Sequence, residues 1–187
     1  MASLPGRLSL DDIDDRGLAN RASDGDIRAF EVLVRRYEQL LGAYASRVLG
    51  SNADVDDVVQ EAFIAAWQQL PTMEDFGAVK AWLITIVTRK SIDRLRAAKE
   101  HKDIDEVEIE ARADGPDVTA SANSLDEALS KALSALPPDQ RRCWLLREVA
   151  GYGYDQIAEQ LGLPVSTVRG LLARSRKTLV REMEAWR

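Results

Sequence analysis

The sequence contains one cysteine, Cys143, and one histidine, His101. A single cysteine excludes an internal disulfide, and the two residues together cannot supply the four ligands of a structural zinc site. Cys143 lies among large apolar residues, so we interpret it as a buried structural thiol in preference to a redox sensor. The scarcity of both residue types therefore excludes a disulfide-stapled domain and a cysteine/histidine zinc module.

Long apolar runs are also missing. No run approaches the ~20 residues that a membrane-spanning helix needs, and residues 1–10 lack the apolar core of a signal peptide. We therefore expect a cytoplasmic protein without membrane insertion. The sequence has no phosphate-binding loop, no nucleophile placed beside a base and no constellation of metal ligands, so we expect neither a cofactor nor an enzyme.

Charge is distributed unevenly along the 187 residues, which are enough for one or two small domains. The net charge of -6 would disfavour binding to nucleic acid if it were spread evenly, but residues 103–127 hold much of the acid. One basic block consists of Lys80, Arg89, Lys90, Arg94, Arg96, Lys99 and Lys102, and a second lies near the C-terminus. The overall charge therefore does not exclude a nucleic-acid partner.

Residues 154–180 have the pattern of a helix, a tight turn and a second helix. Apolar residues recur at helical spacing on both sides of Gly162, which can adopt a left-handed turn conformation, and Ser166 or Thr167 can cap the second helix. The outer face of this second helix carries Arg169, Arg174, Arg176, Lys177 and Arg181, with no acid before Glu182. Such a face is expected of a helix in a DNA major groove, although a solvated basic face on an ordinary helical hairpin has the same pattern.

The first half of the chain predicts several amphipathic helices. Asp26 is expected to cap a helix that ends at Gly50, and Asp54 is expected to cap a very regular helix over residues 54–70. Pro71 ends that helix, and a loop over residues 72–77 leads into a helix over residues 78–98 that mixes core residues with the first basic block.

Acidic residues begin the helix over residues 54–70. Negative charge in a first turn stabilises the helix dipole. The same helix can instead form a docking surface, in which Asp57, Gln60 and Glu61 bind a basic partner and Phe63 or Trp67 adds apolar contact. The residues alone leave both interpretations open.

Two segments lack periodicity and are expected to be flexible: a leader at residues 1–17 and an acidic linker at residues 101–124. Helices resume with a leucine stripe from Leu125, and Asp139 is expected to cap the helix after Pro137 and Pro138. The sequence thus predicts an all-α fold with two small helical domains, at residues 18–100 and 125–187, on a tether.

Three stretches carry a resemblance to a known family. They read DVDDVVQEAFIAAWQQL at residues 54–70, AWLITIVTRKSIDRLR at residues 81–96 and LPPDQRRCWLLREVAGYGYDQIAEQLGLPVSTVRGLLARSRKTL at residues 136–179. In this order they resemble a group IV, or extracytoplasmic-function (ECF), sigma factor of bacterial RNA polymerase, in the sigma-70 family. The resemblance implies a stress-response transcription initiation factor that directs core polymerase to promoters and assists their opening.

The resemblance also implies binding surfaces on the first, sigma-two domain. The helix over residues 54–70 would bind the polymerase beta-prime coiled coil, through Asp54, Asp57, Gln60, Glu61, Phe63 and Trp67. The following loop and helix would hold the unwound non-template strand of the minus-ten element, through Thr72, Phe76, Lys80, Thr85, Thr88, Arg89 and Lys90. Capture of a base that has left the stack favours the open promoter.

The second, sigma-four domain would contact the beta flap and read the minus-thirty-five element as duplex DNA. Its implied DNA-binding residues are Ser166, Thr167, Arg169, Gly170, Ala173, Arg174, Arg176 and Lys177. Many relatives have TVKSRL or TVRSRI where this chain has TVRGLL, so Gly170 lacks a side chain and Leu171 replaces a cation. Lys90 also departs from a common asparagine.

Two functions from different classes fit these residues. The first is an initiation factor held inactive by an anti-sigma factor. In this case we hypothesise that the acidic linker lies in the RNA channel of the polymerase, where its charge imitates that of the transcript. The second is a stand-alone helix-turn-helix regulator, which would bind its operator without polymerase.

Overall fold

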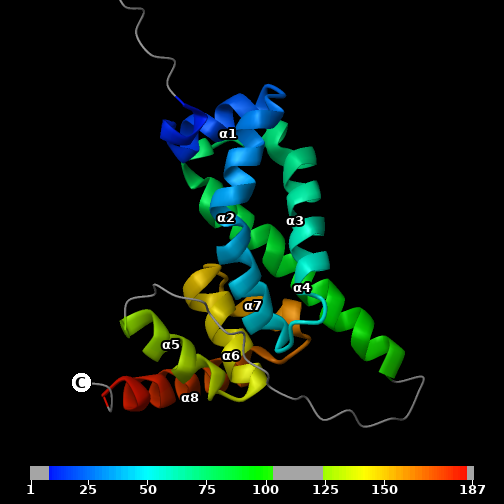
Figure 1. Cartoon of the computed structure of the whole chain (residues 1–187). Coiled ribbons are helices and arrows are strands. Elements are labelled where there is room, and N and C mark those ends of the chain that lie inside the picture. Colours follow the sequence, from blue (N-terminus) through cyan, green and yellow to red (C-terminus); the bar gives the residue numbers. More distant parts are fainter. Residues whose placement is uncertain (1–8, 103–123, 185–187) are drawn as a thin grey trace, which may run out of the picture.

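The computed structural model describes residues 9–102 and 124–184. Over those residues the chain consists of α-helices and short helical turns with no strand, which confirms the all-α prediction. Figure 1 shows a long upper lobe that contains the first helices and a smaller lower lobe that contains the last ones. The predicted linker lies almost wholly outside the described residues.

The first lobe contains α1 (Asp15–Ser23), α2 (Ile27–Leu49), α3 (Val55–Gln69) and α4 (Val79–Lys102). Helix α2 packs against each of the other three, and its apolar stripe supplies much of the first core. Asp26 caps α2 by accepting from the backbone N–H groups of Arg28 and Ala29, and Gly50 ends it with φ of 79°. Both predicted ends of α2 are therefore confirmed, because local chemistry sets them.

The predicted leader extends too far, because its second half is folded onto α2. A short 3-10 helix covers Leu10–Asp12, and Asp14 caps α1 by accepting from the N–H of Gly17. The Arg36 guanidinium donates to the carbonyl oxygens of Asp11 and Ile13, at 2.6 and 2.8 Å. A side chain of α2 thus fixes the chain entering α1, and composition does not reveal such a contact.

The second lobe contains α5 (Ser124–Ser134), α6 (Pro138–Trp144), α7 (Tyr154–Leu161) and α8 (Val165–Glu184). A five-residue π-helical segment, Leu145–Val149, continues α6 toward α7. Cys143 is fully buried in the second core, and burial raises the pKa of its thiol to about 11. This confirms a structural thiol, because a protonated and inaccessible sulfur is a poor nucleophile.

Three predicted helix caps are wrong in detail. Asp54 precedes α3 but its carboxylate makes no cap hydrogen bond, since it pairs with Arg94. Asp139 lies inside the first turn of α6, which Pro137 precedes. Helix α8 begins at Val165, so Ser166 and Thr167 also lie inside the first turn. In each case the helix begins close to the predicted position, but tertiary contacts or proline geometry determine its first residue and its capping.

The two lobes pack directly against each other. The C-terminal carbonyl oxygens of α2 accept hydrogen bonds from the second lobe, those of Arg47 and Val48 from Arg141 and Arg142, each at 3.0 Å. In the opposite direction, Arg96 of α4 donates to the carbonyl oxygen of Gln160, at the end of α7, at 2.8 Å. Guanidinium groups therefore satisfy helix C-termini across the interface, where carbonyls lack intrahelical partners.

An apolar contact completes this interface. Ile92 of α4 is 1% exposed and belongs to the core cluster of the second lobe, with Cys143, Leu146 and Val168. Its burial adds about 2 kcal/mol of hydrophobic stabilisation to the interface. The chain has the two helical lobes that the sequence predicts. These lobes also contact each other through buried apolar side chains.

Candidate nucleic-acid interface

The helix-turn-helix consists of α7, a turn at Gly162 and α8. Gly162 has φ of 64°, the left-handed conformation that the sequence predicts for it. Ile157 of α7 packs with Val168 and Leu172 of α8, and all three are essentially buried. Because these residues occupy one face of α8, the opposite face remains open to solvent.

The residues predicted to bind the minus-thirty-five element lie on that open face. The structure leaves exposed the side chains of Ser166, Thr167, Arg169, Ala173, Arg174, Arg176 and Lys177, with Gly170 among them and partly covered. A face that is exposed, cationic and free of acid along one helix has the geometry of a major-groove reader. Their DNA contacts remain predictions.

The ring of Tyr154, which the sequence did not indicate as part of the site, contacts two arginines at this face. The guanidinium carbon of Arg147 lies 5.1 Å from the ring centroid of Tyr154, and that of Arg169 lies 5.8 Å from it. Both distances lie within the range of cation–π attraction. Arg176 is held nearby by Glu148 at 2.8 Å. The sequence signal was the aromatic residue at the start of α7, but only the fold brings Arg147 and Arg169 to its ring.

Gly170 has a local role on this face. A Cβ atom at this position would lie 3.4 Å from Nη1 of Arg174, so the guanidinium of Arg174 lies close over the glycine backbone. The missing side chain therefore leaves room for a neighbouring cation one turn along the helix.

The residues predicted for the minus-ten strand lie on the 3-10 turns before α4 and on α4 itself. Thr72 and Lys80 are exposed, whereas Phe76 is half-buried and packs against the first core. Thr85 and Arg89 are accessible on α4. These side chains come from one continuous stretch of chain, and their DNA contacts remain predictions.

Thr88 is a correction to this set. Its side chain is 0% exposed, donates to the carbonyl oxygen of Ile84 at 2.6 Å and shares a hydrogen bond with the Tyr44 hydroxyl at 2.9 Å. A buried and satisfied hydroxyl cannot line the path of a DNA strand. The prediction failed because Thr88 faces α2, where Tyr44 needs a polar partner for its hydroxyl.

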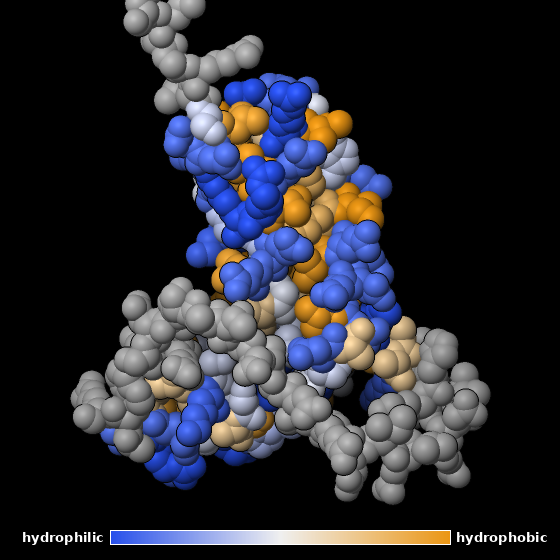
Figure 2. All heavy atoms as spheres, viewed as in Figure 1, coloured by the Kyte–Doolittle hydropathy of each residue, from blue (hydrophilic) through white to orange (hydrophobic). Residues whose placement is uncertain are grey.

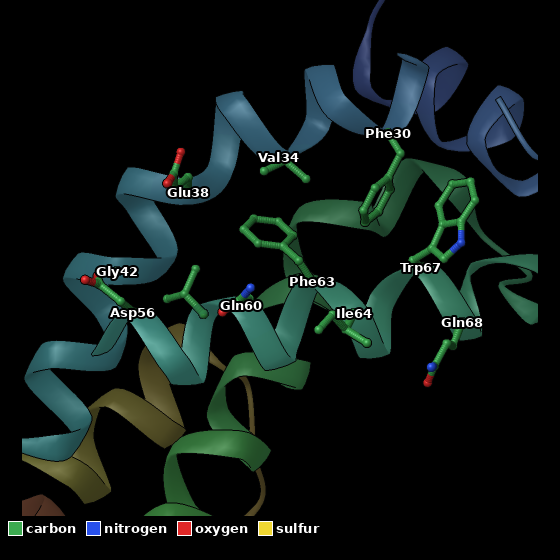
Figure 3. Close-up of a pocket in the computed structure, with 11 residues that line it drawn as sticks. Phe30, Val34, Glu38, Gly42, Asp56, Gln60, Phe63, Ile64, Trp67 and Gln68 are labelled. Carbon is green, nitrogen blue, oxygen red and sulfur yellow. The ribbon is translucent and has the colours of Figure 1, made fainter. Parts of the chain in front are cut away.

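A hydrophobic groove runs between α2 and α3, and Figure 2 shows apolar side chains gathered along it. Its volume is about 590 Å³. Phe30 and Val34 form the α2 wall, and Phe63, Ile64 and Trp67 form the α3 wall (Figure 3). Phe30 contacts Phe63 edge-on, with ring centroids 6.3 Å apart. The groove is therefore a preformed apolar surface that a partner helix can cover.

The six residues predicted to bind polymerase are divided between two faces of α3. Gln60, Phe63 and Trp67 line the groove. Asp54 and Glu61 face α4 instead, where Asp54 pairs with Arg94 and Glu61 pairs with both Arg94 and Lys90. Asp57 is exposed. The structure thus brings only part of the predicted set together, because helical periodicity places residues 54 and 61 two turns apart on a different side from the groove.

No candidate metal centre occurs in the part of the chain that the structure describes, where no group of three histidine, cysteine or acidic side chains is placed to hold a metal ion. None of the helices formed by these residues is long and apolar enough to span a membrane.

Comparison with known proteins fits both lobes. The Sigma-70 region 2 family matches residues 33–101, and the Sigma-70, region 4 family matches residues 126–179. The ECF RNA polymerase sigma-E factor of Escherichia coli K12 is 32% identical over 176 residues, which cover 88% of this chain and 92% of that protein. The chain belongs to the ECF sigma factor family. The sigma-E factor of Haemophilus influenzae is 28% identical over 181 residues, covering 91% and 95% of the two chains.

A solved structure of another sigma factor agrees with the fold. The sigma factor RpoE of Bartonella quintana, crystallised in complex with the anti-sigma factor NepR, is 27% identical, with a TM-score of 0.55. The match covers 84% of this chain and 98% of that chain. Within this chain, the region 2 match runs from α2 to near the end of α4, and the region 4 match runs from α5 to most of α8.

Proposed function

We propose that this sigma factor docks on core RNA polymerase through the groove between α2 and α3, and that it then places α4 and α8 on two separate elements of a promoter. The groove is the observation that carries the proposal. It presents Phe63, Ile64 and Trp67 beside the polar Gln60, within the part of the chain that matches region 2 of the family. A helical partner surface would bury these residues and leave α4 accessible on the other side of α3.

The polar rim of the groove supports a basic partner. Glu38 from α2 and Asp56 from α3 line one end, and Asp57 is exposed on the same helix. Acidic groups around an apolar centre steer a cationic surface and exclude an acidic one. The beta-prime coiled coil is the proposed occupant during initiation, and the beta flap is the proposed partner of the second lobe.

DNA recognition is assigned by the same reasoning. The exposed cations of α8 fit duplex DNA, in which the planar fork of Arg174 can donate two hydrogen bonds to guanine. The accessible residues of the 3-10 turns and α4 fit the unwound strand, with Thr88 removed from the set. An anti-sigma factor is the proposed regulator, since a relative of similar fold is described in complex with one.

The test is binding to purified core polymerase. Ile64 is an exposed apolar residue of the groove, 54% exposed, so Ile64→Lys should weaken core binding at least tenfold by placing an unpaired charge in the apolar contact. Ile27 is 62% exposed on α2 and lies outside the groove, so Ile27→Lys is the matched control and should leave binding unchanged. Equal binding by both variants would reject the groove as the docking site. Absence of binding by the unaltered chain would reject the function, and run-off transcription would test it independently.

A further inference from the structure

Two acidic residues, Glu61 of α3 and Asp54 just before that helix, pair with two cations of α4. Glu61 is shared, with one carboxylate oxygen 3.1 Å from Arg94 and the other 3.4 Å from Lys90. Asp54 takes the second terminal nitrogen of Arg94 at 3.1 Å. Both terminal nitrogens of Arg94 are therefore engaged, and the four side chains together carry no net charge.

These ion pairs are placed where a partner can reach them. The side chains of Glu61 and Asp54 are 48% and 42% exposed, and those of Lys90 and Arg94 are 34% and 32% exposed. Half-exposed pairs are weak, since water and salt screen them and two side chains must be ordered. Each carboxylate holds its cation in place in the free chain, yet a partner that binds the carboxylate more strongly can break the ion pair.

The cations concerned lie on the helix proposed to follow the unwound DNA strand. Lys90 follows the accessible Arg89 on α4, and Arg94 lies one turn further along. A cation that is already paired with a carboxylate gains little binding free energy from a phosphate, because it must first break its existing ion pair. The acids of α3 thus reduce the electrostatic attraction of α4 for a single strand.

We propose that Glu61, with Asp54, masks Lys90 and Arg94 in the free chain, and that a basic partner surface that reaches these two acids, on the side of α3 that faces α4, releases the cations for the DNA strand. Binding of polymerase and binding of single-stranded DNA are then coupled through shared carboxylates, and by linkage each strengthens the other. The inference rests on the proposed function, in which a basic partner docks at α3 and the strand lies along α4, and it requires that this partner extend from the groove to the side of α3 that faces α4.

The opposite role for the same contacts predicts the opposite result. If Glu61 only positions Lys90 and Arg94 for DNA, its removal should weaken DNA binding. If Glu61 masks them, its removal should strengthen DNA binding by the free chain and make that binding more dependent on salt. The sign of the change therefore separates the two roles.

The experiment compares Glu61→Gln with the unaltered full-length chain. The probe is a fluorescent single-stranded oligonucleotide of mixed sequence, because the electrostatic term does not depend on sequence. At low salt we expect the variant to bind about twofold to fivefold more tightly. The slope of log affinity against log salt should steepen by up to about 1.4, or about 0.7 for each released cation.

Glu31→Gln is the matched control. Glu31 is exposed on α2 outside the groove, and its substitution removes the same charge, but its carboxylate makes no ion pair with the residues that the structure describes. A general change in net charge would affect both variants equally, whereas unmasking affects only Glu61→Gln. In a Lys90→Gln background the gain from Glu61→Gln should fall, because one of the two cations is gone.

Each outcome decides the inference. An affinity for Glu61→Gln equal to that of Glu31→Gln, or weaker than that of the unaltered chain, overturns the inference. Should Glu61→Gln prove unfolded by circular dichroism, Asp54→Asn removes one of the two carboxylates that pair with Arg94 and should show a smaller gain of the same sign. If the unaltered chain fails to bind core polymerase the proposed function fails, and that measurement is separate from the DNA affinity of the free variants.

Discussion

At the scale of single residues, the exposed face of α8, which is proposed to bind DNA, depends on side chains that do not belong to that helix. Tyr154 comes from α7, and its ring contacts Arg147 from the preceding segment and Arg169 from α8. A guanidinium held over a ring keeps its hydrogen-bond donors free, because cation–π attraction uses the flat face of the group. Tyr154 therefore limits the conformations of Arg169 without consuming its donors.

Replacement of Tyr154 tests this arrangement. Tyr154→Leu should weaken binding to the duplex upstream element of a transcribed promoter by about twofold to fivefold, the equivalent of about 0.5 to 1 kcal/mol. Tyr154→Phe keeps the ring and should retain most of the affinity. The measurement is the dissociation constant of the holoenzyme by fluorescence anisotropy, and an equal loss for both variants would show that the hydroxyl group, rather than the ring, is required.

At the scale of elements, the N-terminal helix is attached to α2 by charge. Asp15 of α1 accepts a hydrogen bond from Arg36 at 2.8 Å and a second one from the Tyr37 hydroxyl. Burial alone would raise the pKa of the Asp15 carboxyl, but the hydrogen bonds from Tyr37 and Arg36 outweigh it and lower that pKa below the ordinary 3.8. The ionised carboxylate is therefore the form that the folded chain stabilises.

The pH dependence of stability follows from that direction. A lowered folded pKa means that the contribution of Asp15 is fully present above pH 3.8 and disappears as pH falls through the folded value. Asp15→Asn should lower the free energy of unfolding by about 1 kcal/mol at pH 7, since solvent screens this partly exposed group. The difference from the unaltered chain should shrink below about pH 4.

Urea denaturation at neutral and acid pH measures both quantities. Asp12→Asn is a suitable control, because Asp12 is exposed and its side chain makes no hydrogen bond with the described residues. A loss of stability for Asp15→Asn that is the same at both pH values would contradict the ionised state as its cause.

At the scale of the whole molecule, the two lobes are joined by an interface of buried apolar side chains and arginine hydrogen bonds. The two promoter elements are separate sites, whereas the lobes share buried contacts around Ile92 and the end of α2. Burial also lowers the pKa of Arg141, whose guanidinium lies beside the positive Arg142. Charged groups with few water contacts favour a closed arrangement only while their hydrogen bonds to the opposite lobe are intact.

Removal of the bridging arginines should therefore open the chain. The double variant Arg96→Ala, Arg142→Ala loses donors to the carbonyl oxygens of Gln160 and Val48, which water can then solvate. We expect a larger radius of gyration by small-angle X-ray scattering while the helix content stays the same. Arg181→Ala is the control, since the Arg181 side chain is 75% exposed and pairs only with the adjacent Glu182 among described residues. An unchanged radius for the double variant would show that the remaining contacts, among them Ile92 and the hydrogen bond from Arg141 to Arg47, are enough to hold the lobes together.

The sequence by itself determined the local features of this protein. The apolar period, the Asp26 cap and the glycines at 50 and 162 define the helices and their ends, because these depend on neighbours within a few residues. The exposed cationic face of α8 also follows from periodicity alone. The recognition of three ordered stretches was enough to identify the family, since each stretch is continuous in the chain.

Only the tertiary structure decided what each face meets. It buried Thr88 against Tyr44, turned Asp54 and Glu61 toward the cations of α4, and formed the groove from two helices. It also folded residues 10–17 onto α2 and packed the lobes together. A helical period shows which residues share a face, but the partner of that face comes from distant parts of the chain, and packing and charge compensation select it.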